Sequence, residues 1–188
     1  MIGVLGLQGD FDAHCKMLEH AGETAAIVKK PAQLASLRGL IIPGGESTTL
    51  IRLMELYGFW EALPRFVDEG KGIFGTCAGM ILLASEVKNP CQKSLGLIDL
   101  AVERNSYGRQ RESFETTGSF ERRGKSIEVP MVFIRAPRIL RVGPKAQPLA
   151  FQGDECVMAQ QGKVLVASFH PELTNSALIH EYFMEMVQ

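Results

Sequence analysis

Apolar and polar positions in the first half of the chain follow two alternating patterns. Short aliphatic runs at residues 2–7, 25–28, 40–42 and 72–74 have the length and composition of buried β-strands. Between them, apolar residues recur at helical spacing, which predicts helices over residues 11–21, 48–57, 60–69 and 80–84. This alternation is typical of an α/β fold. We therefore expect three layers, with a mostly parallel central sheet and helices on both faces.

Polar residues and glycines mark where these helices begin and end. Asp10 is predicted to cap the first helix, and Gly22 to stop it. Ser47 or Thr48 is predicted to cap the second helix, and Gly70 to close the third.

The second half of the chain has a different pattern. Residues 98–142 alternate apolar and polar positions with little helical periodicity, which predicts antiparallel or mixed strands added to the sheet. Residues 157–160 and 164–168 flank a Gln-Gly pair and predict a hairpin. Residues 176–187 predict a closing amphipathic helix. No linker or repeat interrupts the pattern, so a single domain over residues 1–188 is expected.

Composition narrows the function classes. The net charge is −1 and 46% of residues are hydrophobic, which argues against a nucleic-acid or anionic-membrane partner. Apolar runs are too short to span a bilayer, and the N-terminus lacks a basic leader, so it is interpreted as a first strand. Four scattered cysteines without a CxxC pair favour neither disulfides nor zinc. A cytoplasmic protein without metal or cofactor is expected.

A nucleophile is predicted at the turn after residues 72–74. The pentapeptide Gly75-Thr76-Cys77-Ala78-Gly79 has the glycine–nucleophile–glycine spacing of a nucleophile elbow between strand and helix. Glycines are needed on both sides because the turn is tight, and the helix N-terminus favours a thiolate. Free cysteines are often simply buried, but this setting favours a catalytic thiol.

A cysteine nucleophile requires a base and a group that orients it. His170 follows a predicted strand, and Glu172 lies two residues later, on the same side of an extended segment. His14, His20 and His180 lie on predicted helices, where exposure is the default expectation. Alone, the His-Pro-Glu run could be a surface turn; together with Cys77 it predicts a Cys-His-Glu triad.

An oxyanion site is predicted at the same edge of the sheet. Strand carboxyl ends gather ligands in open α/β sheets, so Cys77 and His170 should meet there. Gly44 and Gly45 also follow a strand, and backbone N–H groups of Gly45 and Ala78 could stabilise a developing negative charge.

These segments resemble the class I, triad-type glutamine amidotransferases, which are flavodoxin-like in fold. Within that class the chain is similar, over essentially its whole length, to the family of glutaminase subunits of pyridoxal 5′-phosphate synthase. The narrower resemblance rests on residues 5–9, 43–49, 102–110, 133–137 and 168–173.

The resemblance implies hydrolysis of L-glutamine to L-glutamate and ammonia through a glutamyl thioester. It implies ammonia transfer to a (β/α)8-barrel synthase subunit, within a large hetero-oligomer that activates the glutaminase and makes vitamin B6. Gln8 and Gly44 are implied to order the oxyanion loop. The implied glutamine-binding residues are Gly45, Glu46, Ser47, Arg104, Ile134 and Arg135. A guanidinium at Arg104 also suits an amino-acid carboxylate.

Three alternatives remain open. A flavodoxin-like cysteine hydrolase usually places its histidine directly after the cysteine, where this chain has Ala78. A non-catalytic subunit would not need Cys77, His170 and Glu172 together. An ammonia donor for a different synthase is opposed only by the segments around Arg104 and Arg135.

Overall fold

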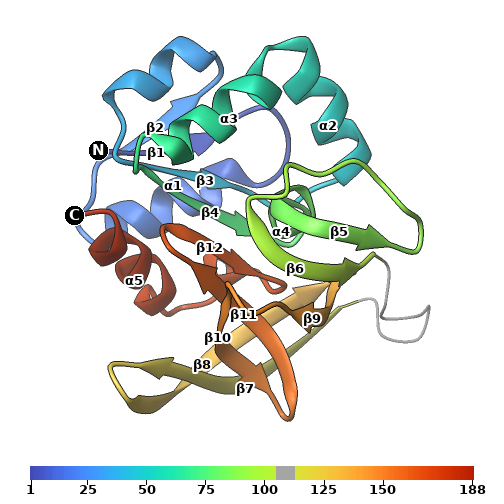
Figure 1. Cartoon of the computed structure of the whole chain (residues 1–188). Coiled ribbons are helices and arrows are strands. Elements are labelled where there is room, and N and C mark those ends of the chain that lie inside the picture. The colour runs from blue at the N-terminus through green and yellow to red at the C-terminus, as the bar shows by residue number, and fades with distance from the viewer. Residues whose placement is uncertain (105–112) are drawn as a thin grey trace.

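The computed structural model describes residues 1–104 and 113–188 of the chain; residues 105–110 of the family resemblance lie outside it. Its main sheet begins with parallel strands in the order β2-β1-β3-β4-β12. Their bounds are β1 Ile2–Leu5, β2 Ala25–Val28, β3 Gly39–Ile42, β4 Gly72–Thr76 and β12 Val164–Ala167. These strands cross the middle of the molecule (Figure 1). The predicted α/β architecture is confirmed.

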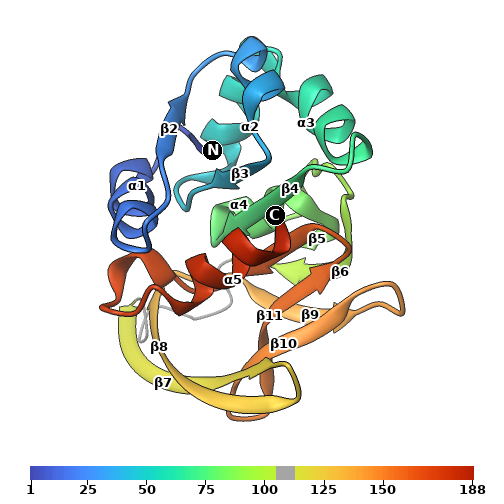
Figure 2. The ribbon, with the colours of Figure 1, turned by 90° about the vertical axis from the view of Figure 1, so that its left-hand side faces the viewer.

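Helices cover both faces of the parallel strands (Figures 1 and 2). Along β3, Ile41 belongs to one hydrophobic core, while Leu40 and Ile42 belong to the other. Strand side chains alternate between faces, so two separate cores result. Helices α1 (Phe11–His20) and α5 (Leu178–Met186) complete the first core. The second is completed by α2 (Ser47–Leu56), α3 (Phe59–Asp68) and α4 (Ala78–Leu83), with the short turn η1 (Pro31–Ser36) nearby.

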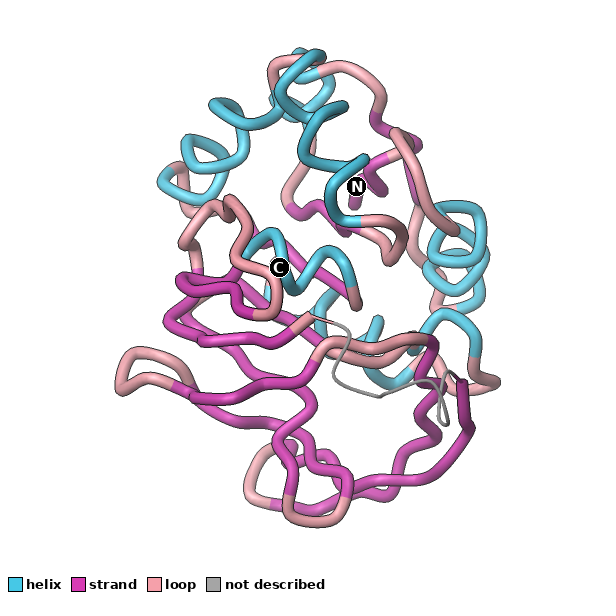
Figure 3. Tube along the Cα trace, turned by 90° about the vertical axis from the view of Figure 1, so that its right-hand side faces the viewer, coloured by secondary structure: helices cyan, strands magenta, loops and turns pink. Residues whose placement is uncertain are grey.

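Antiparallel strands extend the main sheet beyond β12. They follow in the order β11 (Glu155–Gln161), β10 (Gln147–Gln152), β7 (Ser113–Arg122) and β8 (Lys125–Ile134). The predicted hairpin is confirmed, with Gln161 of β11 paired to Val164 of β12. Strands gather at one end of the molecule, opposite most of the helices (Figure 3). The β7–β8 ribbon lies at this end (Figures 1 and 2).

A second sheet was not expected. Strands β5 (Ala84–Lys88), β6 (Ile98–Glu103) and β9 (Arg138–Val142) pair separately from the main sheet. The prediction for residues 98–142 is therefore right for β7 and β8, but wrong in adding every strand of this segment to one sheet. Apolar side chains of β5 and β6 instead pack on α4.

Several predicted boundaries need correction. The first strand ends at Leu5, and the helix after Cys77 begins at Ala78 and ends at Leu83. Asp10 caps α1 as predicted, accepting the N–H of Ala13 at 3.2 Å. The cap of α2 is Glu46 rather than Ser47 or Thr48.

Glu46 rather than Ser47 caps α2 because the two side chains have different hydrogen-bond partners. The Glu46 carboxylate accepts the N–H of Thr49 at 2.8 Å, while the Ser47 hydroxyl donates to Gln92 at 3.0 Å. Glu46 therefore satisfies an otherwise unpaired helix N–H.

Polar segments follow the carboxyl ends of the parallel strands, at one edge of the sheet. Gln8 follows β1, the Gly44–Gly45 loop follows β3, Cys77 follows β4, and His170 follows β12. In the described residues, the structure has no helix that is long and apolar enough to cross a membrane.

Candidate active site

Cys77 lies in a tight turn between β4 and α4. Its φ of 47° is in a region that non-glycine residues seldom occupy, and its side chain is only 7% exposed. A Cβ on Gly75 would lie 2.6 Å from the backbone of Gly79, and one on Gly79 would lie 2.3 Å from the carbonyl oxygen of Ile42. Both glycines are thus required by packing, as the elbow pattern predicts.

His170 and Glu172 form a buried hydrogen-bonded pair. Nδ1 of His170 lies 2.7 Å from Oε1 of Glu172. The expected neighbours do meet, but the backbone between them is not extended. Pro171 begins a short 3-10 turn, η2 (Pro171–Leu173), and this turn places the carboxylate against the imidazole. Because the carboxylate accepts the Nδ1 proton, Nε2 is left to face the thiol.

The electrostatics of this pair favour a charged imidazole. Burial by itself lowers the pKa of His170, but hydrogen bonds to Cys77 and Glu172 outweigh burial and raise that pKa to about 10. Burial by itself raises the pKa of Glu172, but His14 and His170 outweigh it and hold this pKa well below the usual range. The pair is therefore an imidazolium and a carboxylate at neutral pH.

The loop after β3 lies directly against the pair. A Cβ on Gly44 would come within 2.4 Å of Cε1 of His170 and 3.3 Å of Cβ of Cys77. Gln8 holds the far side of the loop, because its Oε1 accepts the N–H of Glu46 at 3.0 Å. A Cβ on Gly45 would meet that same Gln8 side chain at 2.6 Å. The loop therefore fits only if it is made of glycines.

Glu46 and Arg104 form an ion pair at the pocket rim, with Nη2 of Arg104 3.3 Å from Oε1 of Glu46. The hydrogen bond from Thr48 is the main reason that the pKa of Glu46 falls to about 2. Burial slightly opposes this effect, and the bonds from Thr49 add to it. Glu46 is thus a fixed anion that orients the Arg104 guanidinium toward the pocket loop.

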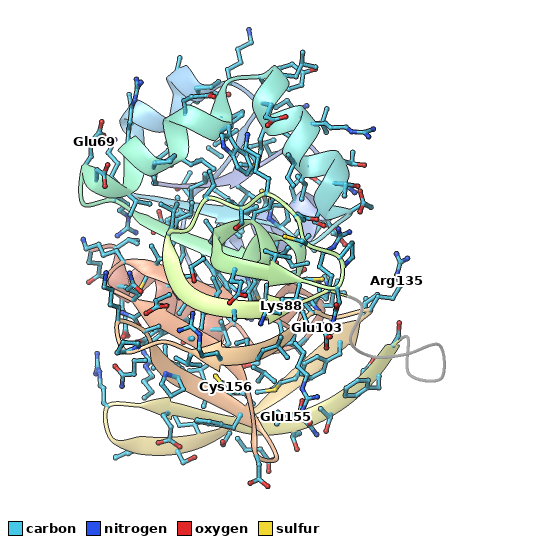
Figure 4. The ribbon with its side chains drawn as sticks, turned by 45° about the vertical axis from the view of Figure 1, so that its right-hand side comes forward. Glu69, Lys88, Glu103, Arg135, Glu155 and Cys156 are labelled. Atoms are coloured by element: carbon cyan, nitrogen blue, oxygen red, sulfur yellow. The ribbon has the colours of Figure 1, made fainter. Side chains whose placement is uncertain are left out.

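Ile134 and Arg135 approach the cysteine from the end of β8. The carbonyl oxygen of Ile134 lies 4.0 Å from Sγ of Cys77. Arg135 has a φ of 43°, and its side chain extends away from the ribbon (Figure 4). This segment therefore presents backbone groups, rather than the Arg135 side chain, to the cysteine.

Nearly all of the predicted site residues border one pocket of about 370 Å³. This volume suits a small polar molecule, and its lining combines a thiol, an imidazolium, a guanidinium and backbone amides. Of the predicted site residues, Ala78 alone is not among the pocket-lining residues, although its N–H begins α4 beside Cys77. The described lining includes Gln8, Gly44, Gly45, Glu46, Ser47, Cys77, Arg104, Ile134, Arg135, His170 and Glu172.

The prediction that the three helical histidines are exposed is wrong for two of them. His14 and His180 are both 0% exposed, whereas His20 is exposed as expected. A signal was present in the sequence. His14 is four residues from Leu18, and His180 is three from Phe183, so each shares the buried face of its helix. The four cysteines are all free.

Solved structures define the class of protein. A crystal structure described as a glutamine amidotransferase is 47% identical, covers 99% of this chain and 98% of its own, and has a TM-score of 0.92. PurLQS from Thermotoga maritima shares the fold. It is 15% identical and has a TM-score of 0.72, over 100% of this chain and 98% of its own. The fold is that of a glutamine amidotransferase.

Sequence relatives define the family. The model of the SNO glutamine amidotransferase family matches residues 4–188. The subunit named pyridoxal 5′-phosphate synthase subunit PdxT in Thermosipho africanus is 51% identical, over 100% of this chain and 98% of the relative. The subunit of the same name in Brevibacillus brevis is 50% identical, over 100% and 97%. The chain belongs to the SNO glutamine amidotransferase family, which confirms the predicted class and enzyme type.

Proposed function

We propose that this chain is the glutaminase of a pyridoxal 5′-phosphate synthase and that Cys77, His170 and Glu172 form its catalytic triad. One observation carries the proposal: the strained cysteine and the buried His-Glu pair border the same pocket. The full-length relatives are named as subunits of that synthase, which supports the choice of this pathway over another ammonia acceptor.

In the first half of the reaction, Cys77 attacks the side-chain amide carbon of glutamine. The thiol proton resides on His170, whose raised pKa keeps the imidazole protonated beside the sulfur. As the tetrahedral intermediate collapses, His170 gives this proton to the departing nitrogen. The C–N bond breaks, ammonia leaves, and a γ-glutamyl thioester remains on Cys77.

In the second half, water hydrolyses the thioester. His170 is now neutral and accepts a proton from the water as the oxygen attacks the thioester carbon. The C–S bond then breaks, glutamate leaves, and the thiolate–imidazolium pair is restored. Glu172 keeps the imidazole oriented and stabilises its cationic form in both halves.

Negative charge on the substrate oxygen is stabilised by the N–H groups of Gly45 and Ala78. The N–H of Ala78 is at the start of α4, where helix geometry leaves N–H groups without an intrahelical partner. Gly45 belongs to the loop that Gln8 fixes through the N–H of Glu46. Gly44 leaves room for His170, so Gln8 and Gly44 act by ordering this loop.

Glutamine is held by groups at the pocket rim. Arg104 binds the α-carboxylate, and Glu46 keeps its guanidinium in place. Gly45, Ser47, Ile134 and Arg135 complete the binding surface, the last two through their backbone. The chain functions as one domain without metal or cofactor.

Ammonia passes to a (β/α)8-barrel synthase subunit within a large hetero-oligomer in the cytoplasm, and this partner completes the oxyanion site.

The isolated chain should therefore hydrolyse glutamine slowly, and addition of the barrel subunit should raise kcat at least about 10-fold. This is a lower bound, because one oxyanion donor usually contributes more than that. Coupled measurement of glutamate release, with and without the barrel subunit, checks this. Full activity of the isolated chain would contradict partner completion, and activation by another synthase alone would assign a different pathway.

Gly44→Ala is expected to lower kcat about 10²-fold and to cost about 1 to 3 kcal/mol in the free energy of unfolding, the usual range for overpacking. The new methyl group would displace the His170 ring, and Gly44 does not need a positive φ. Gly22→Ala is the matched control. Gly22 has a φ of 83° and open space around it, so alanine there should cost about 1 kcal/mol of stability and no activity. Equal activity in both variants would refute the close approach of Gly44 to the triad.

A further inference from the structure

Two fully buried histidines outside the triad continue its hydrogen-bond chain. His14 on α1 and His180 on α5 are 0% exposed and lie on the face of the sheet away from α2 and α3. Nδ1 of His14 lies 2.9 Å from Nε2 of His180. Nε2 of His14 lies 3.2 Å from Oγ1 of Thr76, the residue before the nucleophile, and 3.4 Å from Oε2 of Glu172.

The Glu172 carboxylate requires a donor on the side that His170 does not reach. His170 occupies Oε1, while Oε2 is buried and has no well-aligned hydrogen bond within the described residues. A buried carboxylate oxygen without a donor is costly. Nε2 of His14 is positioned to supply this donor, shared with Thr76 in a three-centre arrangement.

The proton positions follow from the acceptors. A carboxylate can only accept, so Nε2 of His14 carries a proton. In the Nε2–H tautomer of His14, Nδ1 is bare and accepts the Nε2 proton of His180. That leaves Nδ1 of His180 bare, and this buried atom has no partner in the described part of the chain. A bare acceptor costs less than an unpaired N–H, and no extra charge is buried.

We propose that His14 is a positioning residue that holds the Glu172 carboxylate for His170, and that His180 fixes the His14 tautomer. The chain of donors runs from His180 through His14 and Glu172 to His170. The inference rests on the proposed function of the triad and adds two residues from α1 and α5, which do not touch the substrate. Burial lowers the pKa of His180 to about 3, which fits a neutral donor at the end of the chain.

Few charges face this network. His14 is faced by His180 from α5 and by Glu172 from η2, with the Phe74 ring of β4 packed between the helices. Glu172 also borders a surface pocket whose charged or titratable lining residues, all near or on α1, are Asp10, Asp12, Lys16 and His20. His20 is thus a suitable control, because it is a histidine beside the same pocket that is not part of the network.

The test compares His14→Leu, His14→Gln and His20→Gln in the complex with the synthase subunit. Leucine removes the donor to Glu172, so kcat should fall about 10- to 100-fold with KM unchanged, the range typical of lost orienting partners. Glutamine places an amide N–H near the position of Nε2 and should recover kcat to within about 3-fold. His20→Gln should match the unmodified chain.

The pH profile separates positioning from packing. Loss of the His14 donor makes the Glu172 carboxylate easier to protonate, so the acid limb of kcat/KM should move to higher pH in His14→Leu and return in His14→Gln. Unchanged kcat in His14→Leu would overturn the proposal. Equal losses in both His14 variants with an unmoved acid limb would also overturn it, because that result indicates packing alone.

A measurement on the unmodified chain does not depend on either variant folding. Imidazole ¹⁵N shifts should show His14 and His180 as neutral Nε2–H tautomers, and an Nδ1–H tautomer of His14 would overturn the proposal. Absence of glutamine hydrolysis by the unmodified complex would instead refute the proposed function. The two failures are therefore distinguishable.

Discussion

Cys77→Ala is expected to lower kcat for glutamine hydrolysis on the order of 10⁴-fold or more, measured as glutamate release in the presence of the synthase subunit. The sulfur is the atom that forms the thioester, and no other described side chain of the pocket can replace it as a nucleophile of that strength. The fold should survive, because alanine keeps the Cβ and a small apolar side chain at a position that is only 7% exposed.

Cys91→Ala is the matched control, since Cys91 is free and exposed. It should keep normal turnover, and both variants should unfold within a few degrees of the unmodified chain. A Cys77→Ala complex that still turns over glutamine near the normal rate would refute the covalent mechanism. Mass spectrometry of a trapped glutamyl adduct, present in the unmodified chain and absent from Cys77→Ala, gives a second measurement.

His170→Asn should lower kcat about 10³-fold while leaving assembly with the synthase intact. Asparagine can keep a hydrogen bond to Glu172, which lies 2.7 Å from the imidazole, but it cannot carry a proton between sulfur, nitrogen and water. Alkylation of Cys77 should also slow at neutral pH, because the imidazolium that stabilises the thiolate is gone.

The double variant Cys77→Ala/His170→Asn tests whether the two residues act as a unit. Its kcat should be no lower than that of Cys77→Ala alone, because a base without its nucleophile contributes little. Multiplied losses would show that His170 acts independently of Cys77, and near-normal turnover in His170→Asn would remove the imidazole from the mechanism.

Much of the fold could be predicted because local pattern and tertiary role agree in the first half of the chain. The run at Ile2–Leu5 and the elbow at Cys77 are specified by nearby residues: apolar side chains on both faces of the strand, and glycines where a Cβ would clash. The α2 cap was misplaced by one or two residues because serine, threonine and glutamate can all accept a helix N–H. Long-range partners, such as Gln92 for Ser47, decide among them.

The second sheet and the contact between the two buried histidines could not be predicted for a different reason. Strand β9 joins β5 and β6 through pairs such as Leu100 with Val142, which are far apart in the sequence, and alternation along a strand does not say which sheet it joins. Likewise, helical spacing indicates that His14 lies on a buried face, but it does not indicate that His180, 166 residues away, is the partner.

The position of Cys77 and His170 at the ends of neighbouring parallel strands also has a consequence for synthesis of the chain. Cys77 is synthesised 93 residues before its base, so nascent chains that end before residue 170 contain the Cys77 thiol without the His170 imidazole. Pairing of β12 with β4 brings the two residues together. This pairing joins segments that are far apart in the sequence, so it forms at a high entropic cost. Reactivity is therefore acquired late, when most of the chain that buries the cysteine has already been made.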